Sequence, residues 1–322
     1  MNEEFNAKNS GRLDKVLSQY LDKSRNQVEQ LIKEGLVRVN EKVVIKTSFK
    51  VVVNDKIAYR FRTALPKEKV VVDFDVEVLY EDEVMMVVNK PAGLVVHPAP
   101  SVKEATLVDW LIQRGISLST LAGEERHGIV HRIDKDTTGA LVIAKTNEAH
   151  QKLSLQLKDK SMGRYYLALI DCPLKESGIV EKAIGRSRNN RLKMDVVPEG
   201  KEAKSAFYKL DESDTKVELI AVKLFTGRTH QIRVHLNSLG RHILGDVLYG
   251  FKSKRDTIKR VYLHAYKLYL THPISEKRVE FVAPLFSDMR YFIDKNFNQG
   301  EIDEKINPTA IDGYFRTLVN RM

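Results

Sequence analysis

The chain has 322 residues, 43% of them hydrophobic, and it carries 53 Lys and Arg against 43 Asp and Glu, a net charge of +10. A chain of this length can form two domains without covalent cross-links, and its basic surplus favours a polyanionic partner such as nucleic acid. The single cysteine, Cys172, excludes an internal disulfide and a zinc site of the Cys-x-x-Cys kind.

Hydropathy predicts neither a membrane helix nor a secretory signal. Apolar runs such as residues 85–88 and 139–144 end well short of the roughly 18 residues that span a bilayer. The first residues, MNEEFNAKNSGR, are polar. We therefore expect a cytoplasmic location and no membrane partner.

Residues 1–62 have the pattern of a small separate domain. Apolar residues at helical spacing predict one helix near residues 13–21 and a second that Ser24 and Gln27 open as a capping box and Gly35 ends. Alternating patterns predict short strands at residues 36–40, 42–45 and 50–58. The segment has 13 Lys and Arg against 8 Asp and Glu, so it holds half of the net charge.

Basic side chains gather on the two predicted helices, at Arg12, Lys15, Lys23, Arg25 and Lys33. Any one of them is more often a solvated surface group. Their clustering favours a patch that contacts nucleic-acid phosphates.

A charged linker with Pro66 is expected at residues 63–69, followed by a body at 70–295 and a C-terminal extension at 296–322. Strands are predicted near residues 76–79, 84–89, 140–145, 165–170, 216–223, 267–270 and 278–282. Helices are predicted near residues 105–113, 147–158, 230–239 and 288–295. Because the two kinds of element do not alternate strictly, the body is expected to be α+β with a mixed, mainly antiparallel sheet.

Four segments of the body combine Gly, His, Arg and carboxylates at turns beside apolar strands, which is where catalytic groups often lie. These segments are residues 89–98, 127–139, 226–233 and 244–246. A metal site at His127, His131 and Asp134 needs a helix, whereas residues 129–133 favour an extended strand. The Gly-x-Ser-x-Gly elbow and the Walker loop are both absent from the sequence, so no metal and no cofactor is expected.

Asp134 is the carboxylate best placed for chemistry. An arginine nearby would favour its ionised form and keep it available as a nucleophile or base. Arg132, Arg228 and Arg233 are the candidates. The alternative is that Asp134 only caps a turn.

Two stretches resemble known families. Residues 12–57, RLDKVLSQYLDKSRNQVEQLIKEGLVRVNEKVVIKTSFKVVVNDKI, resemble the S4 RNA-binding domain, with Asn54 where the family usually has Gly. The body is similar to the RluA family of pseudouridine synthases, and with an S4 domain it is closest to the RluD-type enzymes of large-subunit ribosomal RNA. The carrying motifs are VVNKPAGLVVHPAPS, HGIVHRIDKDTTGALVIAKT, RYYLAL, LFTGRTHQIRVHLNSLGRHILGDVLYG and RVYLHAYKLYLTHP.

This second resemblance implies roles for five residues of the body. Asp134 matches the catalytic aspartate, Tyr166 the tyrosine that stacks on the target base, and Arg233 the arginine that pairs with the carboxylate. Arg132 matches the arginine that helps hold the RNA open, and Leu263 matches an apolar wall of the uracil pocket. Two departures from the family pattern are a missing proline within residues 240–246 and Arg164 where Lys is common.

The resemblances also imply a function. The S4-like domain would contact structured RNA through Arg12, Lys15 and Arg25, and the body would isomerise specific uridines to pseudouridine without a cofactor. The implied substrate is large-subunit ribosomal RNA. The alternatives are the same chemistry on tRNA, a non-catalytic RNA-binding or ribosome-assembly protein, and a nucleic-acid hydrolase. No obligate protein partner is inferred.

Overall fold

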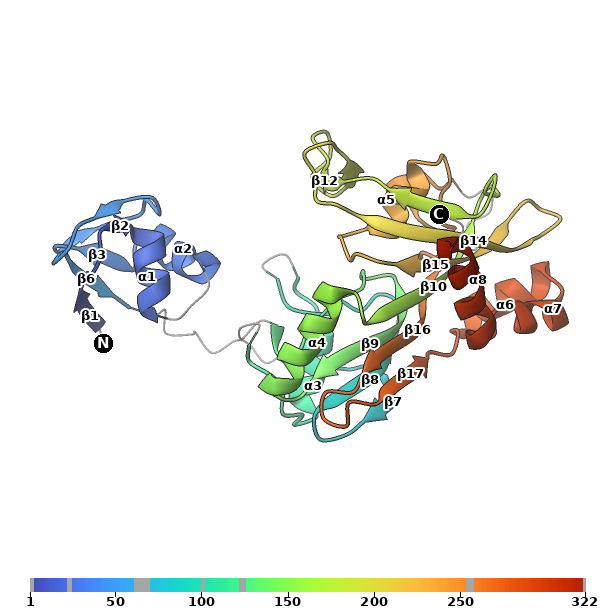
Figure 1. The fold of residues 1–322 in the computed structure, drawn as a ribbon, viewed down its shortest axis with the longest axis horizontal. Coiled ribbons are helices and arrows are strands. Elements are labelled where there is room, and N and C mark those ends of the chain that lie inside the picture. Colours follow the sequence, from blue (N-terminus) through green and yellow to red (C-terminus); the bar gives the residue numbers. More distant parts are fainter. Residues whose placement is uncertain are drawn as a thin grey trace. The chain divides into compact units, whose positions relative to one another are not determined.

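The computed structural model describes residues 3–21, 25–60, 70–99, 102–121, 126–252 and 258–320. The chain divides into two compact units, residues 1–69 and 70–322 (Figure 1). The linker predicted at residues 63–69 and the capping residue Ser24 lie outside the described residues. The domain boundaries assigned from the sequence stay a prediction.

The first unit packs two helices on a four-stranded sheet. The helices are α1 (Leu13–Leu21) and α2 (Arg25–Lys33). The sheet has the order β1 (Glu3–Asn6), β6 (Lys56–Tyr59), β3 (Val37–Val39), β4 (Lys42–Val43), and β2 (Gly11–Arg12) pairs separately with β5 (Lys50–Val51). The fully buried side chains of Leu13, Leu17 and Ile32 pack against Val37 and Ile57 of the sheet. The apolar faces of the two helices are therefore the buried ones, as their spacing in the sequence predicts.

The second unit is built on one nine-stranded sheet. Its members are β7 (Glu77–Glu81), β8 (Met85–Lys90), β9 (Thr138–Ala144), β10 (Gly163–Ile170), β11 (Gly178–Glu181), β14 (Lys204–Glu212), β15 (Glu218–Leu224), β16 (Leu263–Thr271) and β17 (Arg278–Val282). The order is β11-β14-β15-β10-β16-β9-β8-β7, with β17 also paired to β16. Only the β16–β9 pair is parallel, which confirms the predicted mainly antiparallel α+β fold.

Alternate residues of β10 separate two cores. Tyr165, Leu167 and Leu169 face α6 (Ser287–Asn296), α7 (Gln299–Lys305) and α8 (Pro308–Asn320). Tyr166 and Ala168 face the opposite side, where α5 (Gln231–Asn237) packs. This is the period of two expected of a strand that is buried on both faces.

The C-terminal extension predicted at residues 296–322 does not stand apart from the body. Ile302, Ile306, Ile311 and Phe315 of α7 and α8 are buried in the same core as Tyr165. Figure 1 shows α8 lying beside β14 and β10. The two helices therefore cover one face of the sheet.

Helices also cover both faces of the other half of the sheet. Buried residues of α3 (Leu107–Gln113) pack on Met86 and Leu141, and those of α4 (Asn147–Asp159) pack on Val87 and Val142. None of the helices formed by the described residues is long and apolar enough to cross a lipid bilayer.

The parallel join between β16 and β9 is held by a buried histidine. His264 pairs with Thr138, whose hydroxyl oxygen lies 2.8 Å from His264 Nδ1, while Nε2 lies 3.0 Å from the carbonyl oxygen of Ala283. The next residue, Gly139, has a φ of 113°, and a Cβ there would lie 2.3 Å from the carbonyl oxygen of Ala265. Only glycine allows so close an approach of the two strands.

His264 should make stability depend on pH. Burial lowers its pKa to about 4, against the opposing hydrogen bond to Ala283, whereas its unfolded value is near 6.5. Between these two pH values His264 is protonated in the unfolded chain but not in the folded chain. The free energy of unfolding therefore falls as the pH drops from 6.5 to 4. His264→Gln should flatten this part of the curve of Tm against pH. An identical pH dependence in the two proteins would contradict this assignment.

Candidate active site

Asp134 lies in a tight loop just before β9. The residues before it, 129–133, were expected to form a strand, but the structure has only an isolated bridge between Ile129 and Ile143. After Asp134 the chain turns, and the Thr137 N–H donates to the Asp134 carbonyl oxygen at 3.1 Å. The side chain is 21% exposed, so it can reach a ligand while keeping protein contacts on its other side.

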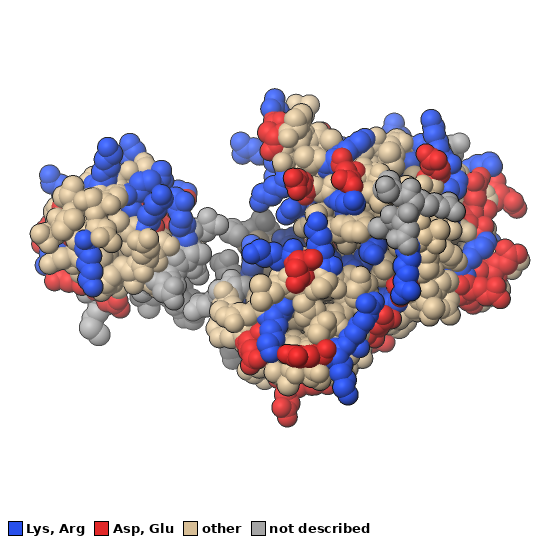
Figure 2. Space-filling view, in the orientation of Figure 1, with Lys and Arg blue, Asp and Glu red and all other residues tan. Residues whose placement is uncertain are grey.

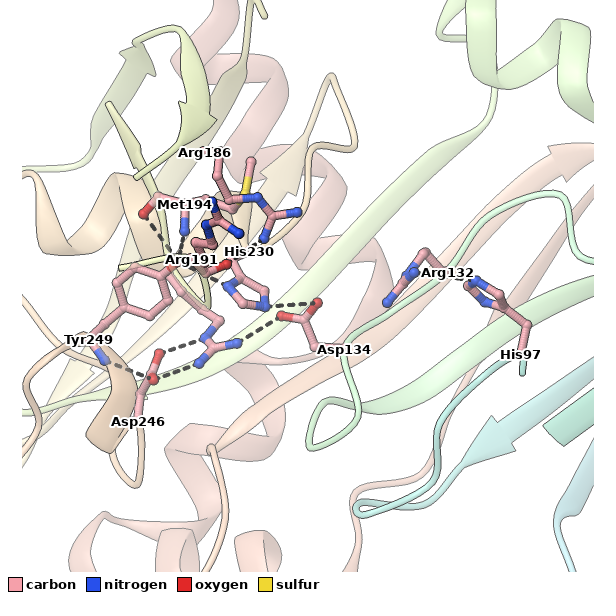
Figure 3. Close-up of polar contacts among 10 residues, drawn as sticks. His97, Arg132, Asp134, Arg186, Arg191, Met194, His230, Asp246 and Tyr249 are labelled. Carbon is pink, nitrogen blue, oxygen red and sulfur yellow. Dashed lines mark hydrogen bonds and ion pairs between the residues drawn. The ribbon is translucent and has the colours of Figure 1, made fainter. Parts of the chain in front are cut away.

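Arg233 of α5 is the cation that contacts Asp134. Its Nη1 donates to Asp134 Oδ2 at 3.1 Å, while Nε and Nη2 each donate to a different oxygen of Asp246 at 2.7 Å. Burial lowers the pKa of Arg233, but hydrogen bonds and charge from Asp246 and Asp134 outweigh it and raise the pKa above its usual value. One permanently charged guanidinium therefore joins two carboxylates (Figure 3).

Asp246 anchors this arrangement and has no role assigned from the sequence. It is 1% exposed and precedes the short 3₁₀ helix η2 (Val247–Tyr249), whose Tyr249 N–H it accepts at 3.3 Å. The sequence feature that could have indicated Asp246 was its place in segment 244–246, next to Gly245. In the structure this glycine has a positive φ. A bidentate partner fixes the plane of Arg233 and leaves Nη1 directed at Asp134.

His230 and Tyr249 complete the polar cluster. His230 Nε2 lies 3.9 Å from Asp134 Oδ1, and its Nδ1 lies 2.9 Å from the Tyr249 hydroxyl. The guanidinium of Arg233 stands over the Tyr249 ring, 4.9 Å from its centroid. Burial lowers the pKa of His230 against the opposing charge of Asp134, so the ring is neutral at neutral pH.

Asp134, His230 and Arg233 border an open pocket of about 110 Å³. Tyr166 and Leu263, from the neighbouring strands β10 and β16, line it together with Asp134 and Arg233. The pairing of β10 with β16 shifts register between Tyr165 and Tyr166, a bulge of the kind that re-aims side chains next to active sites. Burial raises the pKa of Tyr166, partly offset by the charge of Arg164.

Arg132 lies at the same pocket, on the side of Asp134 away from His230 and Asp246 (Figure 3). It is exposed, and its Nη1 lies 3.5 Å from Nε2 of His97. Burial, helped by the charge of Arg132, lowers the pKa of His97 to about 4, which leaves a neutral ring that can accept from the arginine. The structure thus brings five sequence-predicted residues together: Arg132, Asp134, Tyr166, Arg233 and Leu263.

Lys90 supports the Asp134 loop through hydrogen bonds to backbone carbonyl groups. The sequence motifs did not indicate this lysine as a site residue. Its side chain is fully buried, and its Nζ donates to the carbonyl oxygens of Pro91, Leu94 and Lys135 at 2.7, 2.8 and 2.9 Å. Burial lowers its pKa to about 7, against the charges of nearby aspartates. Three carbonyl acceptors match the three N–H donors of an ammonium group, and one of them belongs to the residue after Asp134.

Arg12, Lys15 and Arg25 lie in the first unit. Arg12 and Arg25 both donate to the buried carboxylate of Asp14, at distances between 2.6 and 3.0 Å, and remain about half exposed. The hydrogen bond from Arg12, with help from Arg25, holds the pKa of Asp14 well below its usual range. Lys15 is exposed on α1. The two arginines are therefore held in fixed orientations at the surface.

Both units of the chain resemble known proteins. Residues 84–238 match the RNA pseudouridylate synthase family, and residues 11–57 match the S4 domain. A protein of Helicobacter pylori strain J99, described as an uncharacterized RNA pseudouridine synthase, is 47% identical over 93% of this chain and 94% of its own. The chain belongs to the RNA pseudouridine synthase family. The synthase is thus an isomerase that acts on RNA, as the sequence motifs predicted.

The chain is also similar to two further proteins. The ribosomal large subunit pseudouridine synthase D of Zymomonas mobilis is 38% identical over 87% of this chain and 92% of its own. The solved structure of human RNA pseudouridylate synthase domain containing 1 superposes with a TM-score of 0.53 at 24% identity, covering 69% of this chain and 94% of its own. The second likeness supports the fold of the body.

Asp246→Asn should reduce the turnover of RNA about 100-fold, because Arg233 loses the charged partner that fixes its plane and misplacement near the reacting atoms is costly. Single-turnover assays on RNA would measure the loss. Asp303→Asn is the matched control, since Asp303 of α7 also accepts two hydrogen bonds from one arginine, Arg290 of α6, but is not among the residues that line the pocket. Equal rates for Asp246→Asn and the control would refute the anchoring role.

Proposed function

We propose that the synthase isomerises specific uridines of large-subunit ribosomal RNA, in the cytoplasm, with Asp134 as the reacting carboxylate. The observation that carries this proposal is the contact of Arg233 with both Asp134 and the buried Asp246, at the wall of a pocket that also holds Tyr166. A carboxylate paired with an arginine beside a pocket of this kind can act on a sugar or on a proton.

The reaction breaks the C1′–N1 bond of uridine, turns the uracil and joins C1′ to C5. The hydrogen of C5 is lost and N1 gains one, so substrate and product are isomers and neither water nor an oxidant is consumed. Asp134 has two possible roles: attack on the sugar carbon C1′, or removal of the C2′ proton. Both need a negatively charged carboxylate, and Arg233 places its guanidinium charge 3.1 Å from Asp134 Oδ2.

The pocket walls suit a flat, partly apolar base. Tyr166 offers a ring from β10, and Leu263 offers an aliphatic side chain from β16. A base that enters such a pocket must leave its stack, at a cost of a few kcal/mol. In our proposal the exposed guanidinium of Arg132 helps to meet this cost by holding the opened RNA.

The S4 unit supports a structured RNA as substrate. In the proposal Arg12, Lys15 and Arg25 contact phosphates, and Asp14 keeps two of the three in place. The ribosomal target is supported by the name of the Zymomonas relative, a ribosomal large subunit pseudouridine synthase that is 38% identical over 87% of this chain. Transfer RNA is the alternative substrate.

Asp134→Asn should abolish pseudouridine formation and leave folding and RNA affinity near the wild-type values, because the amide keeps the shape and loses the charge. Release of tritium from 5-tritiated uridine in RNA measures the reaction. Asp136→Asn, an exposed carboxylate in the same loop, should be fully active. Near-normal turnover of the Asp134 variant would exclude it as the reacting group.

Mapping pseudouridine in all RNA from a strain that lacks the gene tests the substrate. Sites lost from large-subunit ribosomal RNA, and restored by wild-type protein but not by Asp134→Asn, would support the proposal. Losses confined to tRNA would move the same chemistry to the alternative substrate. No lost site, together with defective ribosome assembly that the Asp134 variant corrects, would indicate a non-catalytic role.

A further inference from the structure

A small basic hairpin packs next to the active site. Strand β12 (Ile184–Arg186) pairs with β13 (Met194–Val196) apart from the large sheet. The hairpin carries four basic residues within eight positions: Arg186, Arg188, Arg191 and Lys193. Figure 2 shows blue side chains, with some red ones among them, around the β12 end of the body. Positive charge at this density suits the backbone of an RNA substrate.

Tyr249 joins this hairpin to the rest of the body. It is 5% exposed and packs in a small core with Ile184 and Val234, against Met194. Its hydroxyl oxygen accepts the backbone N–H of Met194 at 2.9 Å, which fixes the first residue of β13. One side chain of η2 therefore anchors the hairpin by apolar contact and by a hydrogen bond.

The same hydroxyl contacts the active site. It lies 2.9 Å from Nδ1 of His230, and the other ring nitrogen of His230 faces Asp134. Figure 3 shows this line of contacts from Met194 through Tyr249 and His230 to Asp134. No direct contact between Tyr249 and Asp134 is needed, because His230 lies between them.

The position of one proton decides what His230 presents to Asp134. The Tyr249 hydroxyl can donate to Nδ1 of His230 at 2.9 Å or to the carbonyl oxygen of Met194 at 3.3 Å. Donation to Nδ1 puts the imidazole hydrogen on Nε2, directed at the Asp134 carboxylate. In the opposite tautomer, a lone pair on Nε2 would face the negative charge of Asp134. The shorter contact of the Tyr249 hydroxyl, to Nδ1 of His230, and this electrostatic repulsion therefore both favour the tautomer with its hydrogen on Nε2.

We propose that Tyr249 is a positioning residue that couples the β12–β13 hairpin to Asp134 through the tautomer and orientation of His230. This inference rests on the proposed function. Phosphates held by the hairpin fix Met194, Met194 fixes the Tyr249 hydroxyl, and the hydroxyl sets the Nε2–H of His230 against Asp134. RNA engagement beside the pocket thereby favours the reactive arrangement within it.

Tyr249→Phe tests the proposal with a minimal change. The variant keeps the ring that packs beneath Arg233 and removes only the hydroxyl. At saturating RNA we expect the single-turnover rate to fall about 10-fold, with little change in RNA affinity or Tm. Tyr80→Phe is the matched control, because the Tyr80 hydroxyl also donates a hydrogen bond, to Asp82 at 2.7 Å, away from the pocket.

A double-mutant cycle separates coupling from a purely structural role. His230→Asn is the second variant, since His230 has a φ of 56° and asparagine tolerates this backbone better than most residues. If Tyr249 acts through His230, the double variant should be no slower than His230→Asn alone. Nitrogen-15 spectra of the imidazole should show the Nε2–H tautomer in the wild type and a mixture in Tyr249→Phe.

The outcomes are distinct. A wild-type rate for Tyr249→Phe, or rate losses that multiply in the double variant, would overturn the coupling while leaving the synthase activity intact. A wild-type protein that makes no pseudouridine in any RNA would instead overturn the proposed function. If Tyr249→Phe does not fold, the test falls to His230→Asn, which must be slow at saturating RNA for the inference to stand, and a wild-type rate for His230→Asn would overturn it.

Discussion

The structure depends on one buried arginine that is shared between two carboxylates. Removing a guanidinium from water is costly, and Arg233 is tolerated at 8% exposure because Asp246 binds it in a bidentate pair. The remaining guanidinium nitrogen, Nη1, then donates to Asp134. The position of the candidate catalytic group is thus set by an ion pair on its far side, and α5, η2 and the Asp134 loop must all be in place to form it.

The sheet delivers the other wall of the site. Because β10 alternates between two cores, Tyr166 must face the pocket when Tyr165 packs under α8, and the bulge between them adjusts where the ring lies. The parallel β16–β9 join brings Leu263 beside the end of the Asp134 loop, and it closes only because residue 139 is glycine. Local rules of strand geometry therefore place residues that are about 130 positions apart in sequence.

Much of this could be predicted from the sequence, since motifs next to apolar strands indicated Asp134 and three candidate arginines, and the resemblance to the family then selected Arg233 and Tyr166. Segment 244–246 also stood out, but the roles of Asp246 and Tyr249 come from contacts with α5 that no local pattern encodes. Lys90 carries a similar lesson: a lysine is normally a surface residue, and only the fold shows its three buried carbonyl partners. The helices at residues 299–320 are largely polar in composition, although a few apolar side chains suffice to join them to the core.

The position of α8 also bears on how the protein is made. The strands β10, β14 and β15 are synthesised before α8. During synthesis the face of the sheet that carries Tyr165 and Leu167 is therefore not yet covered by this helix. Contacts between residues so far apart in sequence form slowly. The face of the sheet that carries Tyr165 and Leu167 therefore stays uncovered until the chain up to Phe315 has left the exit tunnel and α8 can pack on it.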